Sequence, residues 1–287
     1  MNRETFERIR RIQIRTRTIL ESGIVGAYHA VFKGRGMEFA EVREYAPGDD
    51  VRTIDWNVTA RMGSPFVKKY VEERDLTLLL LVDLSGSQRF GSRFLLKRDY
   101  AAELAAVLAF SAVANHDRVG AVLFTDRIES YVAARGGRDH ALRIVRDLLA
   151  VEPVGRGTDI AGALRFARQV MKRRGIVAVI SDFQDAGYEK PLGVLRRRHD
   201  VVAIQLFDPG ELDVPSAGLV ALADPETGAL LVVDTSDPGV RRRLRAGTLS
   251  EAQETFRRTR VDALPLSTAE SYERPLAAFF KAREKRR

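Results

Sequence analysis

Residues 76–87 read LTLLLLVDLSGS, an apolar run over 76–82 followed by Asp83, Ser85 and Ser87. A short, bounded and almost uniformly apolar run is typical of a strand that is buried on both faces of a parallel sheet. The three polar residues alternate along the chain where such a strand would leave the core. One carboxylate and two hydroxyls form a cluster of hard oxygens, which suits Mg²⁺ or Mn²⁺. The stretch therefore predicts a buried strand that ends in a metal-binding cluster.

From residue 73 onward, strands and helices alternate in the predicted structure. Apolar runs predict strands at 118–124, 176–181, 201–207 and 263–266, with 128–134 as a strand antiparallel to the first of these. Helices are predicted at 97–115, 139–149, 158–174, 188–197, 238–260 and 274–283, and a hairpin at 220–224 and 229–234. Repeated strand–helix units imply a mainly parallel sheet with helices on both faces. We therefore predict an α/β fold over 73–287, a Rossmann-like doubly wound sheet.

Residues 1–72 form a predicted N-terminal extension of helix, loop and strand. Apolar residues spaced between arginines predict a helix over 3–21, and glycines and prolines divide 24–72 into short pieces, of which 66–71 resembles a strand. The many charged side chains form either an internally ion-paired loop region or a partner surface, and Trp56 either contacts a partner or anchors the extension. The candidate partner-binding residues are Arg35, Glu38, Arg43, Asp49, Asp50, Asp55, Trp56 and Arg61.

The composition of the 287 residues limits the possible functions. There is no cysteine, which removes disulfides, thiolate zinc sites and a cysteine nucleophile, and which fits a reducing compartment. No apolar run approaches the roughly 18–20 residues of a membrane span, so we predict a cytoplasmic protein. The net charge of +8 is concentrated in the Lys- and Arg-rich termini, 1–36 and 281–287. Basic termini are more often solvated than bound to nucleic acid, although they could seat an acidic partner.

Two further residues are predicted to join the oxygen cluster. Asp182 ends the apolar run 176–181, and Thr158 follows a Gly-Arg-Gly break at 155–157. In doubly wound sheets, ligands bind beyond the carboxyl ends of the strands, where successive connections diverge. Each residue alone has a structural explanation, because Ser, Thr and Asp commonly cap turns and helices. Together with Asp83, they could meet at one edge of the sheet.

Five residues together resemble the metal-ion-dependent adhesion site of von Willebrand factor type A domains: Asp83, Ser85, Ser87, Thr158 and Asp182. The resemblance covers residues of about 73–287 in order and type. It implies that the serines and the threonine supply hydroxyl ligands to Mg²⁺ or Mn²⁺, and that the aspartates act directly or through water. Neutral hydroxyls leave the ion electrophilic, so an open position would bind a carboxylate of another protein. One departure is Phe183, because many such domains have glycine after the last aspartate.

The segment before the first strand adds a second resemblance. The motifs Gly34-Arg-Gly-Met-Glu-Phe39, Arg43-x-Tyr45-x-Pro47-Gly-Asp-Asp50, Arg52-x-Ile54-Asp-Trp56 and Ala60-Arg61 resemble the signature of the bacterial family called domain of unknown function 58 (DUF58). Members are associated with MoxR-type AAA+ ATPases and are thought to act with them in chaperone-like assembly or activation. The resemblance implies a non-enzymatic, metal-dependent adaptor whose partners are a MoxR-type ATPase and a client protein that offers an Asp or Glu. Many members carry N-terminal membrane helices; we expect none here, so a membrane role is not carried over from the resemblance.

Two other functions are less well supported by the sequence than the adaptor. A metal-dependent phosphoesterase would use the same oxygens, but the sequence offers no convincing general base beside them. It has neither a P-loop nor a Gly-x-Ser-x-Gly elbow, and its histidines, His29, His116, His140 and His199, are scattered. Nucleic-acid binding through the basic termini lacks interleaved aromatic residues on which bases could stack.

Overall fold

The computed structural model describes residues 7, 10, 12, 25–32, 37–72, 76–92, 95–212, 215–246 and 248–286. The chain forms two compact units: one is Lys33–Leu76, and the other joins Met1–Phe32 to Thr77–Arg287. The helix predicted over 3–21 lies outside the described residues, apart from positions 7, 10 and 12. Helix α2 (Val25–Phe32) belongs to the larger unit, although it lies within the predicted extension.

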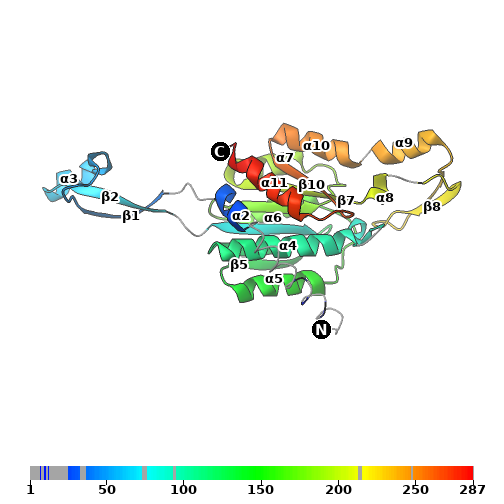
Figure 1. Ribbon diagram of the computed structural model, residues 1–287, viewed down its shortest axis with the longest axis horizontal. Helices are drawn as coiled ribbons and strands as arrows, with labels where there is room; N and C mark the ends of the chain where they lie inside the picture. Colours follow the sequence, from blue (N-terminus) through cyan, green and yellow to red (C-terminus); the bar gives the residue numbers. More distant parts are fainter. Residues whose placement is uncertain are drawn as a thin grey trace. The chain divides into compact units, whose positions relative to one another are not determined.

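The larger unit is built on a six-stranded sheet (Figure 1). All neighbouring strands are parallel except β4 and β5, which are antiparallel, so the mainly parallel doubly wound sheet is confirmed. The strand order is β10 (Asp262–Ser267), β7 (Asp200–Phe207), β6 (Ile176–Ser181), β3 (Thr77–Asp83), β4 (Arg118–Phe124) and β5 (Ile128–Arg135).

Helices cover both faces of this sheet. On one face lie α4 (Lys97–Ala114), α5 (Arg138–Ala150) and α11 (Glu273–Glu284); on the other lie α6 (Ile160–Val170), α7 (Glu189–Arg198) and α10 (Thr248–Thr259). Leu79 and Leu81 of β3 belong to the core beneath α6, α7 and α10. Because side chains alternate along a strand, Leu78 and Leu80 face the α4 side, and all four leucines are buried. Helix α2 packs on α4 and α11, where the Phe32 and Phe280 ring centroids lie 5.6 Å apart.

The connections diverge between β3 and β6, which lie side by side in the middle of the sheet. The chain leaves β3 through α4 on one face, and it leaves β6 through α7 on the opposite face. Such a switch point opens a crevice at the carboxyl ends of the strands, where open α/β sheets bind ligands. The predicted oxygen cluster follows these two strands.

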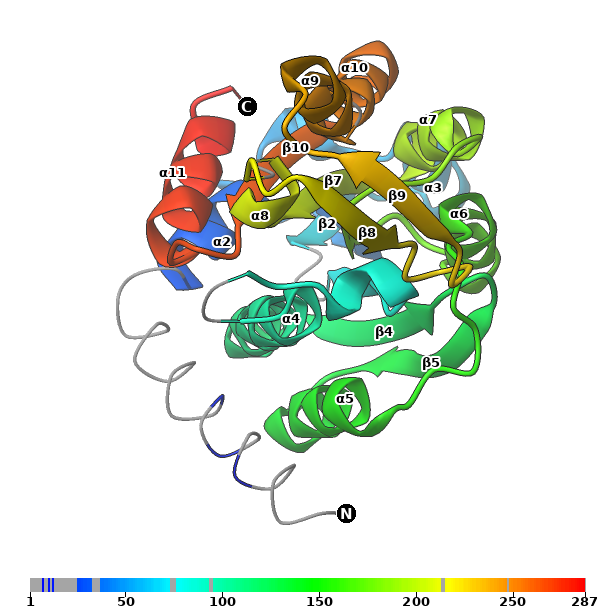
Figure 2. The same cartoon turned by 90° about the vertical axis from the view of Figure 1, so that its right-hand side faces the viewer.

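A hairpin of β8 (Leu219–Ala223) and β9 (Leu230–Asp234) confirms the predicted pair around the Pro-Glu-Thr-Gly turn. Gly228 has φ +73°, the left-handed conformation that this turn requires. Figure 2 views the molecule from the side on which this hairpin lies. The hairpin is preceded by α8 (Pro209–Leu212) and followed by α9 (Pro238–Ala246).

Two helix predictions were wrong in their limits. The stretch 238–260 forms two helices, α9 and α10, rather than one. The helix predicted from Thr158 to about Arg174 spans Ile160–Val170, because Asp159 is its N-cap and accepts a hydrogen bond from the Gly162 amide (2.7 Å). Thr158 therefore lies in the loop before the helix.

The smaller unit is a two-stranded antiparallel ribbon that carries a short helix between its strands. The strand β2 (Phe66–Glu72) confirms the predicted strand, and its partner β1 (Met37–Glu44) was not predicted. The connection holds η2 (Val51–Thr53) and α3 (Trp56–Met62). Gly63 ends α3 in the left-handed conformation, φ +76°, that commonly closes a helix.

Candidate metal centre

Asp83 ends β3 at the switch point, and its side chain is fully buried. Its Oδ1 accepts a hydrogen bond from the Ser85 amide (2.8 Å), and its Oδ2 accepts one from the Ser181 hydroxyl of β6 (2.6 Å). The Ser181 hydroxyl also accepts a hydrogen bond from the Phe183 amide (2.9 Å). Asp83 therefore ties together the carboxyl ends of β3 and β6.

Ser85 and Ser87 are buried in the turn after β3, and their hydroxyl oxygens lie 3.1 Å apart. This turn continues into η3 (Gly86–Arg89). The Gly86 amide donates a hydrogen bond to the Arg156 carbonyl (2.8 Å), which holds the loop that carries Thr158 against the serine turn. The structure thus brings the predicted hydroxyl groups to one edge of the sheet.

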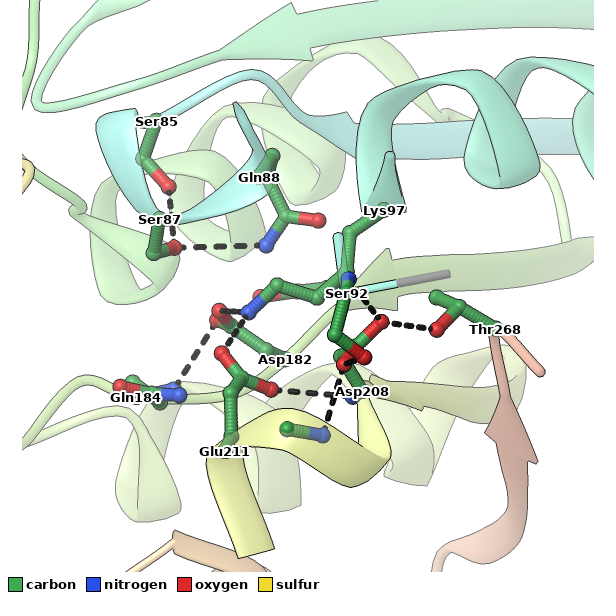
Figure 3. Close-up of polar contacts among 12 residues, drawn as sticks. Ser85, Ser87, Gln88, Ser92, Lys97, Asp182, Gln184, Asp208, Glu211 and Thr268 are labelled. Atoms are coloured by element: carbon green, nitrogen blue, oxygen red, sulfur yellow. Dashed lines mark hydrogen bonds and ion pairs between the residues drawn. The ribbon is translucent and has the colours of Figure 1, made fainter. Parts of the chain in front are cut away.

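Asp182 follows β6 and pairs with a buried lysine (Figure 3). The Nζ of Lys97 lies 2.6 Å from Asp182 Oδ2 and 2.5 Å from Glu211 Oε1, and the Lys97 side chain has no exposed surface. Burial opposes the positive charge, but the two carboxylates outweigh this effect and raise the pKa of Lys97. The other oxygen, Asp182 Oδ1, accepts a hydrogen bond from the backbone amide of Gln184 (3.3 Å). One side of Asp182 is therefore already neutralised by a cation of the protein itself.

Another buried carboxylate, Asp208, holds α8 in place and thereby positions Glu211 (Figure 3). Asp208 accepts hydrogen bonds from Ser92 and from the Thr268 hydroxyl (2.5 Å), and its amide donates to Glu211 Oε2 (3.0 Å). Burial opposes ionisation, but the hydrogen bonds that Asp208 accepts hold its pKa below the ordinary value. This network fixes the carboxylate that shares Lys97 with Asp182.

Thr158 donates a hydrogen bond to a carboxylate from the hairpin tip. The distance from Thr158 Oγ1 to Glu226 Oε1 is 2.6 Å. Burial raises the pKa of Glu226, the hydrogen bond from Thr158 opposes that rise, and the charge of Asp182 adds to it. The hairpin therefore places a carboxylate of this chain next to the predicted threonine ligand.

The charge balance of this cluster fits a divalent cation. Burial and then the charge of Asp182 raise the pKa of Asp83 to about 7, against the hydrogen bonds from Ser181 and Ser85. A cation beside Asp83 and Glu226 would offset the burial and the charge of Asp182 that raise their pKa values, and hard oxygens are the ligands that Mg²⁺ and Mn²⁺ prefer. In the described part of the chain, no three or more carboxylate and histidine side chains are grouped so that they could hold a metal. An ion here would therefore depend on hydroxyl oxygens.

Phe183 occupies the position where glycine is common in metal-ion-dependent adhesion sites. Its φ of 58° lies in the left-handed region, so the backbone takes a path that favours glycine although the residue is phenylalanine. The ring is 3% exposed and packs edge-on against Phe256 of α10, with centroids 4.8 Å apart. Burial of the aromatic ring offsets the backbone strain.

Sequence reasoning did not identify four polar residues of this centre: Lys97, Ser181, Glu211 and Glu226. Lys97 looks like an ordinary first residue of a helix, and Glu226 looks like a turn residue. Only Ser181 carried a usable signal, because it stands at the end of an apolar strand directly before Asp182. The other three reach the centre from elements that are remote in sequence.

The predicted partner-binding residues divide into two groups in the smaller unit. Asp49 pairs with Arg43 (2.6 Å), Asp50 caps η2, and Asp55 caps α3, so these side chains maintain the local structure. Trp56 is 70% exposed, and Arg61 is also exposed on α3. Glu38 lies in β1, and Arg35 lies outside the described residues. Trp56 and Arg61 therefore remain the best placed to contact a partner.

The sheet order, the helices on both faces and the switch point define a doubly wound α/β domain, the fold expected from the resemblance to von Willebrand factor type A domains. The chain belongs to the family described as "Protein of unknown function DUF58", whose model matches residues 41–254. An uncharacterized protein of Mycobacterium tuberculosis is 32% identical over 283 residues, which cover 96% of this chain and 89% of that protein.

Solved structures resemble the fold at low sequence identity. An aerotolerance-related membrane protein from Bacteroides fragilis matches with a TM-score of 0.51 and 15% identity, over 72% of this chain and 99% of that chain. A von Willebrand factor type A protein from Catenulispora acidiphila matches with a TM-score of 0.36 and 11% identity, over 75% and 43% of the two chains. Within the described residues of this protein, no helix is long and apolar enough to cross a membrane.

Gly86→Ala is expected to release the hairpin tip from the serine turn. A Cβ on Gly86 would lie 2.3 Å from the Pro225 carbonyl oxygen, so the hairpin backbone would have to move away. Cleavage after Glu226 by a glutamate-specific protease should then become roughly tenfold faster, because proteolysis follows the population of the open form. The control is Gly157→Ala, whose Cβ would make only ordinary contacts, the nearest at 3.5 Å. Equal cleavage rates for the two variants would contradict the contact between the hairpin tip and the serine turn.

Proposed function

We propose that the protein is a non-enzymatic, metal-dependent protein-interaction adaptor. The hydroxyls of Ser85, Ser87 and Thr158 would hold Mg²⁺ or Mn²⁺, with Asp83 and Asp182 acting directly or through water. Bound there, the metal would supply an electrophilic position for an Asp or Glu of a client protein. The chain orients the hydroxyls through the bonds between Asp83, Ser181 and the Ser85 amide.

The observation that carries this proposal is the hydrogen bond between Thr158 and Glu226. A carboxylate of this chain thus lies beside one of the proposed metal ligands, next to the position where the metal would receive a client carboxylate. Because Glu226 comes from a hairpin tip, a client that offers its own carboxylate would compete with it. The site is therefore suited to exchange one carboxylate for another.

The positions of the histidines support docking over phosphoester hydrolysis. His116 and His199 precede β4 and β7, at the amino ends of the strands, which is the opposite edge from the cluster. His140 is bonded to the Val119 carbonyl (3.0 Å), near the same amino end of β4. These three histidines are thus placed away from the cluster, where they could not serve as its general base.

The proposed partner for the adaptor is a MoxR-type AAA+ ATPase, acting with this protein in chaperone-like assembly or activation of the client. The support is the family to which the chain belongs and the signature motifs of its smaller unit. The decisive test is affinity purification from the source cells, with and without a chelator. We expect the chelator to remove the client; identical recovery in both samples would refute the metal-dependent mechanism.

Trp56→Ala is expected to reduce recovery of the AAA+ ATPase at least roughly tenfold, because exposed aromatic residues are common anchors of protein interfaces. The indole is 70% exposed, so the free energy of unfolding should change by less than about 0.5 kcal/mol. Quantitative mass spectrometry of the purified complex measures the loss. Val154→Ala is the control, because Val154 is 76% exposed and lies in the larger unit. If both variants recover the ATPase equally, Trp56 is not part of the interface.

A further inference from the structure

A polar pocket of about 250 Å³ lies at the edge of the sheet opposite the candidate metal centre. It forms at the amino ends of three adjacent strands, because Arg174 precedes β6, Asp200 begins β7 and Asp262 begins β10. The ends of α7 and α10 and the last turns of α11 complete it. The proposed adaptor function uses none of these residues.

Two buried side chains line this pocket with hydrogen-bonding atoms that have no partner. Arg283 is 6% exposed; its Nη2 and Nε pair with Asp200 (2.6 Å) and Asp262 (2.8 Å), but its Nη1 is unpartnered. His199 is 3% exposed, and neither of its ring nitrogens has a partner. Buried polar atoms without partners are costly, so a ligand oxygen at this place would be bound favourably by both side chains.

The pocket carries an excess of positive charge. Four exposed arginines, Arg174, Arg196, Arg260 and Arg286, surround the buried Arg283. Among the described residues, two acidic ones line it, Asp200 and Asp262, and Arg283 already pairs with both. Burial and the charges of Arg198 and Arg174 lower the pKa of His199, which reflects the same positive field. Five arginines against two aspartates make the pocket attractive to anions.

We propose that this pocket binds a phosphate-type oxyanion, either free phosphate or the phosphoryl group of a small molecule. Guanidinium groups match the oxygen geometry of phosphate, and Arg283 presents its unpartnered Nη1 from a position fixed by two ion pairs. The volume is below the roughly 300–1,000 Å³ of sites for drug-sized ligands, which favours a small anion over a peptide. The basic C-terminal segment, expected to be solvated, thus contributes a buried arginine to a binding site.

The test is isothermal titration of the full chain with inorganic phosphate at constant ionic strength in chloride buffer. We expect saturable binding of one phosphate per chain, and roughly tenfold weaker binding by Arg174→Gln, because a charge-assisted contact is lost. Arg174 is exposed, so this variant should fold, whereas loss of the ion-paired Arg283 could unfold the protein. Arg135→Gln is the matched control, because Arg135 is exposed on β5 at the far side of the sheet.

A parallel titration with adenosine monophosphate distinguishes the two sources of the anion. Tighter binding of phosphate identifies the free ion, and tighter binding of the nucleotide identifies an esterified phosphoryl group; either result supports the site. The proposal is overturned if phosphate binding is not saturable or if Arg174→Gln and Arg135→Gln bind alike. These readouts use no metal or protein partner, so they are independent of the adaptor function.

Discussion

Lys97→Met is expected to lower the free energy of unfolding by roughly 3–5 kcal/mol, the usual cost of removing one partner from a buried ion pair. Lys97 has no exposed surface, and its Nζ lies 2.6 Å from Asp182 and 2.5 Å from Glu211. Methionine retains most of the length and the apolar stem but leaves two carboxylates without their cation. Urea denaturation in metal-free buffer measures the loss.

The control for this variant is Lys190→Met, because Lys190 is exposed on α7 and its replacement should change stability by less than about 0.5 kcal/mol. The same experiment also tests the metal centre. Without the lysine, Asp182 should attract a divalent cation more strongly, so millimolar Mg²⁺ should restore part of the lost stability. A Lys97→Met protein as stable as Lys190→Met would contradict the buried ion pair. A destabilised Lys97→Met protein that does not respond to Mg²⁺ would count against the metal.

Much of the fold could be predicted because the central strands are marked by local runs of apolar residues. The apolar runs that end at Asp83 and Ser181 are typical of central parallel strands, and the repeated strand–helix units indicated the parallel sheet. That these two strands are neighbours required the structure. The hairpin followed from the Pro-Glu-Thr-Gly turn for the same reason, since turn chemistry is local. By contrast, β1 was missed because its charged residues hide the alternation that its pairing with β2 requires.

The surroundings of the candidate site could not be predicted, because they depend on contacts between remote residues. Lys97 meets Asp182 and Glu211 across 85 and 114 positions of the sequence, and Glu226 meets Thr158 across 68. A lysine at the start of a helix can be solvated or buried against two carboxylates, and no local sequence pattern distinguishes the two cases. The sequence therefore indicated the hydroxyl and carboxylate ligands, while the charges that balance them required the structure.

Asp83→Asn is expected to reduce Mg²⁺ affinity by roughly 10–100-fold, the range found when groups that support a metal site are removed. Metal-dependent recovery of the client should fall with it. The amide oxygen can still accept the Ser85 amide, and the amide nitrogen can donate to Ser181, so the fold should be retained. Calorimetric titration with Mg²⁺ and the chelator-controlled purification measure the two losses. The control is Asp126→Asn, a change at an exposed carboxylate in the neighbouring turn. It should alter neither the Mg²⁺ affinity nor the recovery of the client.

The stability of Asp83→Asn separates a metal ligand from a merely structural aspartate. Burial and Asp182 raise the pKa of Asp83 to about 7, so the folded protein holds a proton that the unfolded chain loses near pH 4. Stability of the metal-free protein therefore falls as the pH rises from about 4 to about 7, and it stays low above that range. Asparagine removes this titration, so the variant should be at least as stable as the parent at pH 8 without metal. If Asp83 instead served the fold alone, the variant would be destabilised at pH 8, and added Mg²⁺ would stabilise neither protein.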